Sequence, residues 1–482
     1  MHACTHSTDT SMTMWRPGVP AVPAEASPCL HARLPLPPTL SLKGGMEEEG
    51  LPMLLLLSLP PELLALMVGK VECKDALRLS CCTLRLAVDA CATRLVWCAP
   101  SRAGTPPLSL SLAHVLPAAC TSLQQLYCGG LTTSLASLAA CPPTMQALAC
   151  NGTSVADLGP LAACTALHTL CCDATRVTAL GPLAACRGLQ ELSCSETRVS
   201  DLGPLAACIQ IHTLHCARTQ VSDLGPLAAC TGLRALHCAS TGVANLCPIA
   251  ACTGLQSLHC SGTLVADLGP LADCTRLQSL HCSGTRISDL HPLSRCTGLQ
   301  TFMCSNTDVT DLGPLVSCTG LQTFSCYTTR VADLRPLAAC TRLVTLSCSG
   351  TRVADLRPLA ACTGLQALLC YDTQVADLTP LAACTRLPTL SCANTSVADL
   401  GPLATCTGLQ TLNCSRTQVA HLGPMAACTC LQDLDCSGTL VADLGPLAPC
   451  MALTKVICGS QVPLEQAQQL QSAYPNLMVA RV

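Results

Sequence analysis

The sequence predicts an α/β repeat solenoid, in which short strands and short helical turns alternate along a coiled chain. The first observation is a period of 22 residues, which runs without a slip from Leu123 to Leu453. The second is that apolar residues recur at the same places of each copy, which we number 1 to 22 from its first residue. A period of this length is typical of chains whose repeats stack on one another.

The copy that starts at Leu343, LVTLSCSGTRVADLRPLAACTG, shows the pattern of the others. Apolar residues at places 4 and 6 alternate with small polar ones, which predicts a short strand with one buried face. Ser, Gly, Asn and Thr at places 7 to 9 predict a turn. Asp at place 13 and Pro at place 16 then predict one tight helical turn, because Pro is tolerated where an N–H has no partner. One copy cannot bury its apolar side alone, so stacked copies must share one continuous core.

The pattern LxxLxCxxTxVxDLxPLxxCTx resembles the leucine-rich repeats of the 22-residue, internalin-like class, over residues 101–482. Cys stands here where that class usually has Leu at places 6 and 20, and Thr stands where it usually has Asn at place 9. The resemblance implies a right-handed solenoid of short parallel strands whose concave face binds other proteins. We expect the Thr hydroxyl to bond the neighbouring turn backbone much as the Asn amide does.

The cysteines, 42 in all, fall mostly at places 6 and 20, which are core positions where free Cys behaves as a small hydrophobe. Neighbouring coils of such a stack are about 4.8 Å apart, whereas a disulfide needs Cβ atoms about 3.8 Å apart. We therefore expect reduced, buried thiols and a reducing compartment, the cytoplasm or the nucleus. No Cys-x-x-Cys pair occurs, so the usual spacing of a zinc finger is missing, and His2, Cys4 and His6 lie in a polar tail; no metal site is predicted.

The amino-terminal part divides into a tail and a helical module. Residues 1–50 are rich in Pro, Ser and Thr without apolar periodicity and are predicted to be disordered. Residues 51–98 are predicted to be helical, with helices that begin at residues 60–61 and after residues 74–75, and a third short piece that includes Leu95 and Trp97. A membrane span over residues 51–69 is disfavoured, because two prolines and Glu62 stand in its middle. No signal peptide is expected, because the start lacks a basic stretch before an apolar one.

The motif at residues 59–64, LPPELL, followed by KDALRLS at residues 74–80, resembles an F-box. That resemblance implies a module that docks the adaptor subunit of a cullin-type ubiquitin ligase, with the contact made by Leu59, Pro60, Leu63 and Leu64. The basic pair and the aromatic residue usual in that family after this point are missing here. The alternative is an interaction or structural repeat protein whose helical start only caps the open end of the solenoid.

The rest of the chain follows the period until its carboxyl end. Residues 99–122 are predicted to be a linker with a degenerate repeat, and residues 123–460 to be the repeats. Residues 461–482 are predicted to be a cap, made of a helix over residues 464–473 with Leu464 and Leu470 inward and a last strand.

Stacking turns a place in the copy into a column in space. Asp at place 13 forms one such column, and we expect these carboxylates to cap the helical turns, because a single row offers too few oxygens for calcium. Place 5 points onto the concave face, and there we expect solvated imidazoles, with a soft metal between neighbours as the alternative. Below about pH 6.5 such imidazoles would repel one another when protonated. This column carries Cys171, Ser193, His215, His237, His259, His281 and Met303.

Places 7, 8 and 10 concentrate the residue types that dominate protein interfaces, in otherwise small and polar surroundings. We predict that a protein target binds the concave face at these residues and at the place-5 side chains from His215 to Met303. The residues at places 7, 8 and 10 are Asn306, Asp308, Tyr327, Arg330, Arg352, Tyr371 and Asp372. The chain has 11% charged residues and a net charge of −3, which does not favour nucleic acid. It contains no Gly-rich phosphate loop and no nucleophile elbow, so we expect no enzyme activity and no cofactor.

Overall fold

The computed structural model describes residues 77–79, 94–98, 123–129, 132, 134–136, 144–474 and 476–482. The chain divides into two compact units, residues 1–58 and 59–482, and every described residue belongs to the second. The predicted tail, the F-box-like residues Leu59, Pro60, Leu63 and Leu64, and the linker over 99–122 lie outside the described residues.

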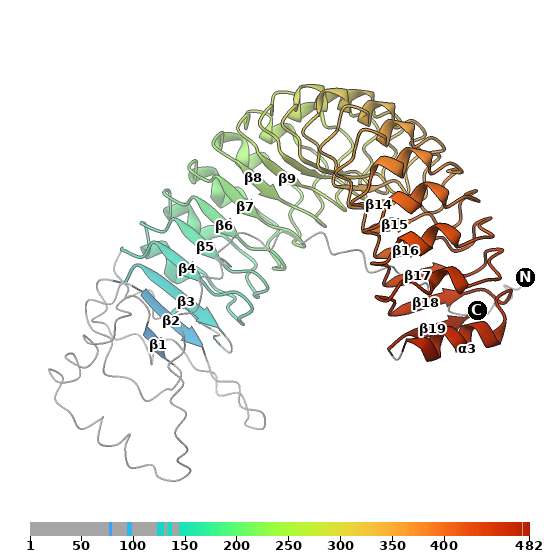
Figure 1. Ribbon diagram of the computed structural model, residues 1–482. Helices are drawn as coiled ribbons and strands as arrows, with labels where there is room; N and C mark the ends of the chain where they lie inside the picture. Colours follow the sequence, from blue (N-terminus) through green and yellow to red (C-terminus); the bar gives the residue numbers. More distant parts are fainter. Residues whose placement is uncertain are drawn as a thin grey trace, which may run out of the picture. The chain divides into compact units, whose positions relative to one another are not determined.

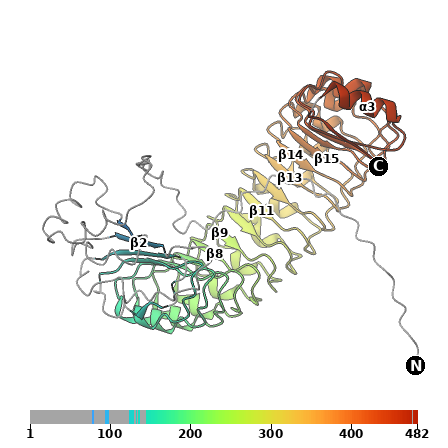
Figure 2. The same ribbon diagram turned by 90° about the horizontal axis from the view of Figure 1, so that it is seen from below.

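The second unit contains one sheet of 19 described strands, in which each strand pairs in parallel with the next along the chain (Figures 1 and 2). The register follows the period, since Leu346 lies opposite Leu368 and Leu368 opposite Leu390. This confirms the predicted solenoid of short parallel strands. The strands are β1 (Leu77–Leu79), β2 (Arg94–Cys98), β3 (Gln125–Gly129), β4 (Ala147–Ala149), β5 (Thr169–Cys171), β6 (Glu191–Ser193), β7 (Thr213–His215), β8 (Ala235–His237), β9 (Ser257–His259), β10 (Ser279–His281), β11 (Thr301–Met303), β12 (Thr323–Ser325), β13 (Thr345–Ser347), β14 (Ala367–Leu369), β15 (Thr389–Ser391), β16 (Thr411–Asn413), β17 (Asp433–Cys436), β18 (Lys455–Cys458) and β19 (Met478–Arg481).

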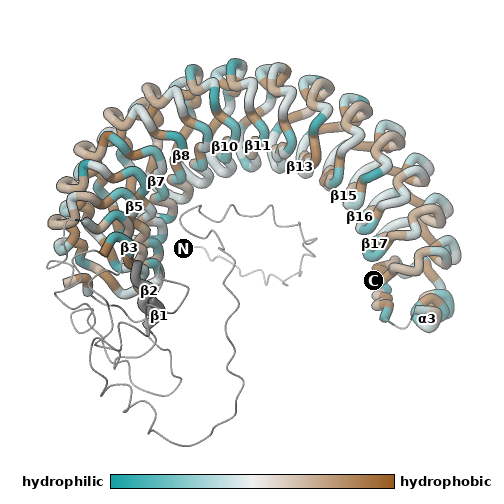
Figure 3. Tube along the Cα trace, turned by 60° about the vertical axis from the view of Figure 1, so that its left-hand side comes forward, coloured by the Kyte–Doolittle hydropathy of each residue, from teal (hydrophilic) through white to brown (hydrophobic). Residues whose placement is uncertain are grey.

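A short 3-10 turn follows each strand from β4 to β17, with Pro at its second residue. The turns are η3 (Gly159–Ala163), η4 (Gly181–Ala185), η5 (Gly203–Ala207), η6 (Gly225–Ala229), η7 (Cys247–Ile249), η8 (Gly269–Leu271), η9 (His291–Arg295), η10 (Gly313–Ser317), η11 (Arg335–Leu337), η12 (Arg357–Leu359), η13 (Thr379–Ala383), η14 (Gly401–Thr405), η15 (Gly423–Ala427) and η16 (Gly445–Leu447). The tube in Figure 3 shows the strands along the inner, concave side of the curved stack, with the turns outside.

The place-13 aspartates cap these turns, as predicted. In each case Oδ1 accepts a hydrogen bond from the backbone N–H two residues later, at 2.6–2.9 Å. The bonded N–H is that of the first residue of the turn, which has no partner within so short a helix. The aspartates are Asp157, Asp201, Asp223, Asp267, Asp289, Asp311, Asp333, Asp355, Asp377, Asp399 and Asp443.

The core lies between the strands and the turns, and the cysteines at places 6 and 20 belong to it. From Cys150 to Cys450 the side chains of both columns are fully buried. As expected from the spacing of the coils, no cysteine whose side chain the structure describes forms a disulfide. The sequence did not predict that the place-20 thiols would link the coils. From Cys186 to Cys450, each Sγ donates to the carbonyl oxygen of the place-20 Cys of the preceding coil, at 3.3–3.6 Å. The cysteine at this position is therefore both a core residue and a hydrogen-bond donor.

The place-9 threonines are buried and bond to the backbone, although to the backbone of their own coil. Each Oγ1 donates to the carbonyl of the place-6 Cys three residues earlier, at 2.6 Å for Thr153 and Thr439. The bond closes the turn over places 6 to 9, where place 8 has positive φ. Among the described residues, Gly occupies that place in five copies, including Gly350, and non-Gly residues such as Asn306 (φ 52°) occupy it in others.

Both ends of the described stack differ in part from the prediction. The predicted carboxyl-terminal helix is present as α3 (Leu464–Ala473), followed by β19. Leu470 is inward as expected, but Leu464 is 56% exposed, because Ala467 shares the buried side of the helix with Leu470 instead.

At the amino end, β1 and β2 are strands where helices were predicted. β1 pairs with β2, and β2 pairs with β3, so they continue the sheet instead of forming a separate helical module. Without β2, the edge of β3 would present unpaired backbone N–H and C=O groups to any extended segment. The RLVWC sequence of β2 contains residues that favour strands and can pair with this edge.

Candidate binding surface

The concave face is formed by the outward side chains of the strands and the turn residues that follow them, at places 3, 5 and 7. Most of these side chains are small, such as Thr, Ser and Ala. Because neighbouring strands are only about 4.8 Å apart, a larger side chain at place 5 is covered by its neighbours above and below. The burial of this column therefore depends on what the adjacent coils carry.

Four histidines occupy this column on β7, β8, β9 and β10 and form a continuous ladder. The rings of His215 and His237 are stacked, with centroids 4.2 Å apart and planes 9° from parallel. The rings of His237 and His259 meet edge to face at 5.7 Å, and those of His259 and His281 at 4.8 Å. The expectation of solvated imidazoles is wrong for His215, which is 1% exposed, while the other three are half-buried.

The ladder disfavours protonation of its members. Burial lowers the pKa of His215 to about 4, with a further contribution from the charge of His259. Burial and the neighbouring imidazoles lower the pKa of His237 to about 3, and burial also lowers the pKa of His281. The rings of His215 and His237 are therefore neutral at pH 6.5, and the expected repulsion between these two begins only in more acidic solution.

The geometry of the first pair does not suit a metal ion. The lone pair of an imidazole nitrogen lies in the plane of the ring, and the rings of His215 and His237 face each other through their π surfaces. No group of three or more His, Cys, Asp or Glu side chains within the described residues is arranged to hold a metal. Met303 follows the ladder on β11, opposite His281, and is half-buried.

The predicted residues at places 7, 8 and 10 lie at the carboxyl ends of β11 to β14, and we call Tyr327, Arg330, Arg352 and Tyr371 the Tyr–Arg patch. Tyr327 is 39% exposed, Tyr371 is half-buried, and both arginines are exposed. Backbone hydrogen bonds hold neighbouring coils of the patch in register. The Arg352 N–H, for example, donates to the Val331 carbonyl of the preceding coil at 2.8 Å.

Three further predicted residues surround the patch, and all are exposed. Asn306 Nδ2 donates to the Tyr327 hydroxyl at 3.0 Å. Asp372 accepts a hydrogen bond from Asn394 Nδ2 at 2.6 Å, which ties the coil of Tyr371 to the next one. Asp308 stands one coil before Arg330, without an ion pair between them in the described structure.

The sequence analysis missed three residues that lie in and beside this patch. Leu369, on β14, occupies place 5, where its neighbours on β13 and β15 have Ser347 and Ser391. Ser349, which occupies place 7 in the coil between those of Tyr327 and Tyr371, is 1% exposed, and Ser391 is 2% exposed. In the described structure neither hydroxyl has a hydrogen-bond partner. A lone Leu in a column of small polar residues was a usable signal, whereas an unpartnered hydroxyl cannot be found from sequence.

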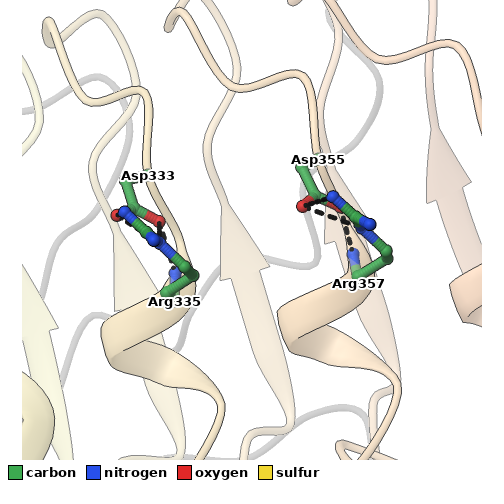
Figure 4. A network of polar contacts seen from close by, with 4 residues as sticks. All are labelled: Asp333, Arg335, Asp355 and Arg357. Carbon is green, nitrogen blue, oxygen red and sulfur yellow. Dashed lines mark hydrogen bonds and ion pairs between the residues drawn. The ribbon is translucent and has the colours of Figure 1, made fainter.

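The two central coils of the patch carry a second pair of arginines, and these are neutralised. Arg335 and Arg357 pair with Asp333 and Asp355 at 2.7 and 2.9 Å at the start of η11 and η12 (Figure 4). Hydrogen bonds from these guanidinium groups and from the backbone lower the pKa of both carboxyl groups.

The comparison with known families agrees with this architecture. The family described as Leucine Rich repeats (2 copies) matches residues 253–295. The coils within residues 253–295 are thus similar to leucine-rich repeats. No curated protein matches the chain.

Solved leucine-rich-repeat structures share the fold. An internalin, InlF, from Listeria monocytogenes is 24% identical over 58% of this chain and 84% of that chain, with a TM-score of 0.57. The functional domain of InlJ from Listeria monocytogenes, whose description includes a cysteine ladder, is 21% identical over 67% and 75% of the two chains, with a TM-score of 0.56. A plant receptor kinase ectodomain from Arabidopsis thaliana, GASSHO1/SCHENGEN3, in complex with CASPARIAN STRIP INTEGRITY FACTOR 2, is 14% identical over 88% and 52%, with a TM-score of 0.66.

Among the residues that the structure describes, no helix is both long and apolar enough to cross a membrane. The segment for which a span was considered, residues 51–69, lies outside them.

Proposed function

We propose that this chain is a protein-binding scaffold that holds a protein or peptide target on the concave face of its leucine-rich repeats. The observation that carries the proposal is the Tyr–Arg patch, because Tyr327 is, among the residues whose side chains are described, the most exposed aromatic residue on a face that is otherwise small and polar. Tyrosine and arginine are the residues that most often dominate binding energy. The scaffold would act by holding its target, without catalytic residues or a cofactor of its own.

The plant receptor ectodomain supports a binding role for this fold, since that protein was solved in complex with a partner. The ladder from His215 to His281 and Met303 would extend the contact surface along the strands, with neutral imidazoles as hydrogen-bonding groups.

The experiment is affinity purification with the full chain and with Tyr327→Ala plus Tyr371→Ala. A target of the concave face should be retained by the parent and reduced at least about tenfold by the double variant. Val316→Ala plus Met451→Ala is the matched control, because both side chains are exposed and apolar (56% and 76%) but lie outside the strands. Equal capture by all three proteins contradicts the proposal for this patch.

The finer role that we propose is that of a substrate-recognition subunit of a cullin-type ubiquitin ligase. It is supported by the F-box-like motif at residues 59–64, and the strands at β1 and β2 count against a long helical module. Co-purification with the ligase adaptor subunit, lost in Leu63→Asp, tests the role. If the adaptor does not co-purify with the parent chain, the alternative remains, a leucine-rich-repeat interaction protein without a ligase partner.

We also propose that the protein works in a reducing compartment, the cytoplasm or the nucleus. The support is that no cysteine whose side chain is described forms a disulfide, and that buried thiols fill two core positions in nearly every copy. Counting thiols in protein purified without reductant tests this, and mostly paired sulfurs would contradict it.

A further inference from the structure

Within the described residues, Arg330 and Arg352 of the Tyr–Arg patch, like most arginines of the solenoid, form no ion pair with a carboxylate. Arg218, Arg295, Arg335 and Arg357 each form an ion pair at 2.7–2.9 Å. Arg335 and Arg357 belong to the same two coils as Arg330 and Arg352. Each of them is paired with an aspartate two residues earlier, Asp333 or Asp355 (Figure 4). Within the described residues, no carboxylate oxygen lies within 4.0 Å of Arg330 or Arg352.

The geometry holds these two arginines side by side. They occupy the same place in neighbouring coils, which the backbone bond between Arg352 and Val331 sets one rung apart, about 5 Å. Their side chains therefore start close enough together for both guanidinium groups to reach a single anion. Their planar forks match the oxygens of a carboxylate or a phosphoryl group.

The same patch contains two buried serine hydroxyl groups, those of Ser349 and Ser391, that have no hydrogen-bond partner in the described structure. Other buried hydroxyl groups on the concave face are paired, as Ser305 is with Ser325 at 2.8 Å and Ser193 with Asp173 at 2.6 Å. Ser349 and Ser391 are buried to the same degree, yet their hydroxyl groups have no partner in the described structure. Buried hydroxyl groups without a partner are rare in folded proteins and call for an explanation.

These two serines lie on either side of the coil that carries Leu369 and Tyr371. Leu369 faces Ser391 across the β14–β15 pair, and the Gly350 N–H donates to the Tyr371 carbonyl beside Ser349. The hydroxyl of Tyr327 is held by Asn306 of the preceding coil. Ser349 therefore lies between Tyr327 and Tyr371 in its column. The Tyr327 hydroxyl is hydrogen-bonded to Asn306, whereas the Tyr371 side chain makes no hydrogen bond in the described structure.

From this arrangement we infer that the patch selects an extended peptide segment with an acidic group. The anion lies between Arg330 and Arg352, and an apolar side chain of the segment packs on Leu369, Tyr327 and Tyr371. Displacement of the Tyr371 ring by the segment gives a polar group of the peptide access to the Ser349 hydroxyl. A carboxylate and a phosphoryl group share the required chemistry. This inference rests on the proposed function, because it names the chemistry of the target that the concave face would hold.

The test is an oriented peptide library screened on the immobilised full chain. Nonapeptides carry a fixed central residue, which is Glu, phosphoserine, phosphotyrosine, Gln or Lys, with degenerate flanks. We expect acidic or phosphorylated centres to bind at least about tenfold more tightly than Gln, with apolar residues enriched next to them. Preference for Glu or for the phosphorylated centres distinguishes the two sources of the anion.

Variants separate this inference from the proposed function. Arg330→Gln plus Arg352→Gln should abolish the acidic preference, whereas Arg335→Gln plus Arg357→Gln, in the same coils, should keep it. Arg330→Glu plus Arg352→Glu should reverse the preference towards Lys. Selection of peptides in a Tyr327- and Tyr371-dependent way without any acidic preference would overturn the inference and leave the scaffold function standing. Absence of selection by the parent chain would overturn the inference. The scaffold function is then decided by the separate affinity purification with the tyrosine variants.

Discussion

The imidazole rings of His215 and His237 lie face to face on β7 and β8, 4.2 Å apart and 9° from parallel. Such close stacking is compatible with neutral rings and opposed by charged ones, because two positive charges at about 4 Å repel each other even in water. The ladder therefore couples the stability of the central strands to the protonation of their outward side chains.

Acid should destabilise the central coils through this ladder. The pKa values of His215 and His237 are lowered from 6.5 to about 4 and about 3 in the folded protein, so the unfolded chain takes up protons first as the pH falls. The free energy of unfolding should thus be insensitive to these groups above pH 6.5 and should decrease between about pH 6.5 and 4. The upper limit is about 3 kcal/mol for His215, at 1.36 kcal/mol per pKa unit. Thermal unfolding followed by circular dichroism over this pH range measures the effect.

The matched variants for this effect are His215→Gln plus His237→Gln, and His421→Gln as the control, because His421 is exposed. Between pH 6.5 and 4, the melting temperature of the double variant should fall less than that of the parent protein. The melting temperature of the His421→Gln control should fall as much as that of the parent. An unchanged acid profile in the double variant would show that other groups cause the acid sensitivity.

Serine should replace cysteine more easily at place 20 than at place 6. Cys318 Sγ donates to the Cys296 carbonyl at 3.5 Å, so a hydroxyl at this position inherits an acceptor. Cys370 is buried at place 6 with no such bond to the preceding coil, so Cys370→Ser should leave a buried hydroxyl unsatisfied, at a cost of about 1–3 kcal/mol. Urea unfolding of the two single variants gives the comparison, and equal destabilisation would mean that the thiol bonds contribute nothing.

Alkylation of the native protein should be confined to the exposed cysteines. Within the described residues Cys247 and Cys430 are exposed, whereas burial raises the pKa of Cys318 to about 11 and that of Cys348 to about 12. Because the thiolate is the reactive form, iodoacetamide at pH 8 should modify Cys247 and Cys430 long before the core cysteines. Peptide mass spectrometry after a timed reaction gives the order. Simultaneous modification of Cys252 or Cys428 would indicate that the coils open on the timescale of the reaction.

Removal of one place-9 hydroxyl should weaken its turn. Thr329 Oγ1 donates to the Cys326 carbonyl at 2.6 Å within the buried turn that precedes Arg330. Thr329→Val keeps the shape and removes the donor, and it should lower the free energy of unfolding by about 1 kcal/mol or more. Thr329→Ser, which keeps the hydroxyl, is the control, and the two are compared by urea unfolding. A Val variant as stable as the Ser variant would contradict a structural role for the bond.

The repeat period was sufficient to predict the parallel sheet, the 3-10 turns, their Asp caps and the two buried cysteine columns. Each of these depends on residues that recur in nearly every copy, so one offset in the sequence defines one column in space. The amino-terminal strands could not be predicted in this way. Residues 77–79 and 94–98 depart from the repeat pattern, and the edge of β3 with which β2 pairs exists only once the coils are stacked.

The sequence by itself determined which residues share a column: the histidines of place 5, the tyrosines of place 7 and the arginines of place 10. Only the tertiary structure decided how each member of a column is surrounded. His215 is buried by its stacked neighbour, and Ser349 and Ser391 are covered without a partner. Arg335 forms an ion pair with an acid, whereas Arg330 forms none in the described structure. The physical reason is that burial and pairing depend on the size and orientation of side chains in adjacent coils, 22 residues away in the sequence and about 5 Å away in space.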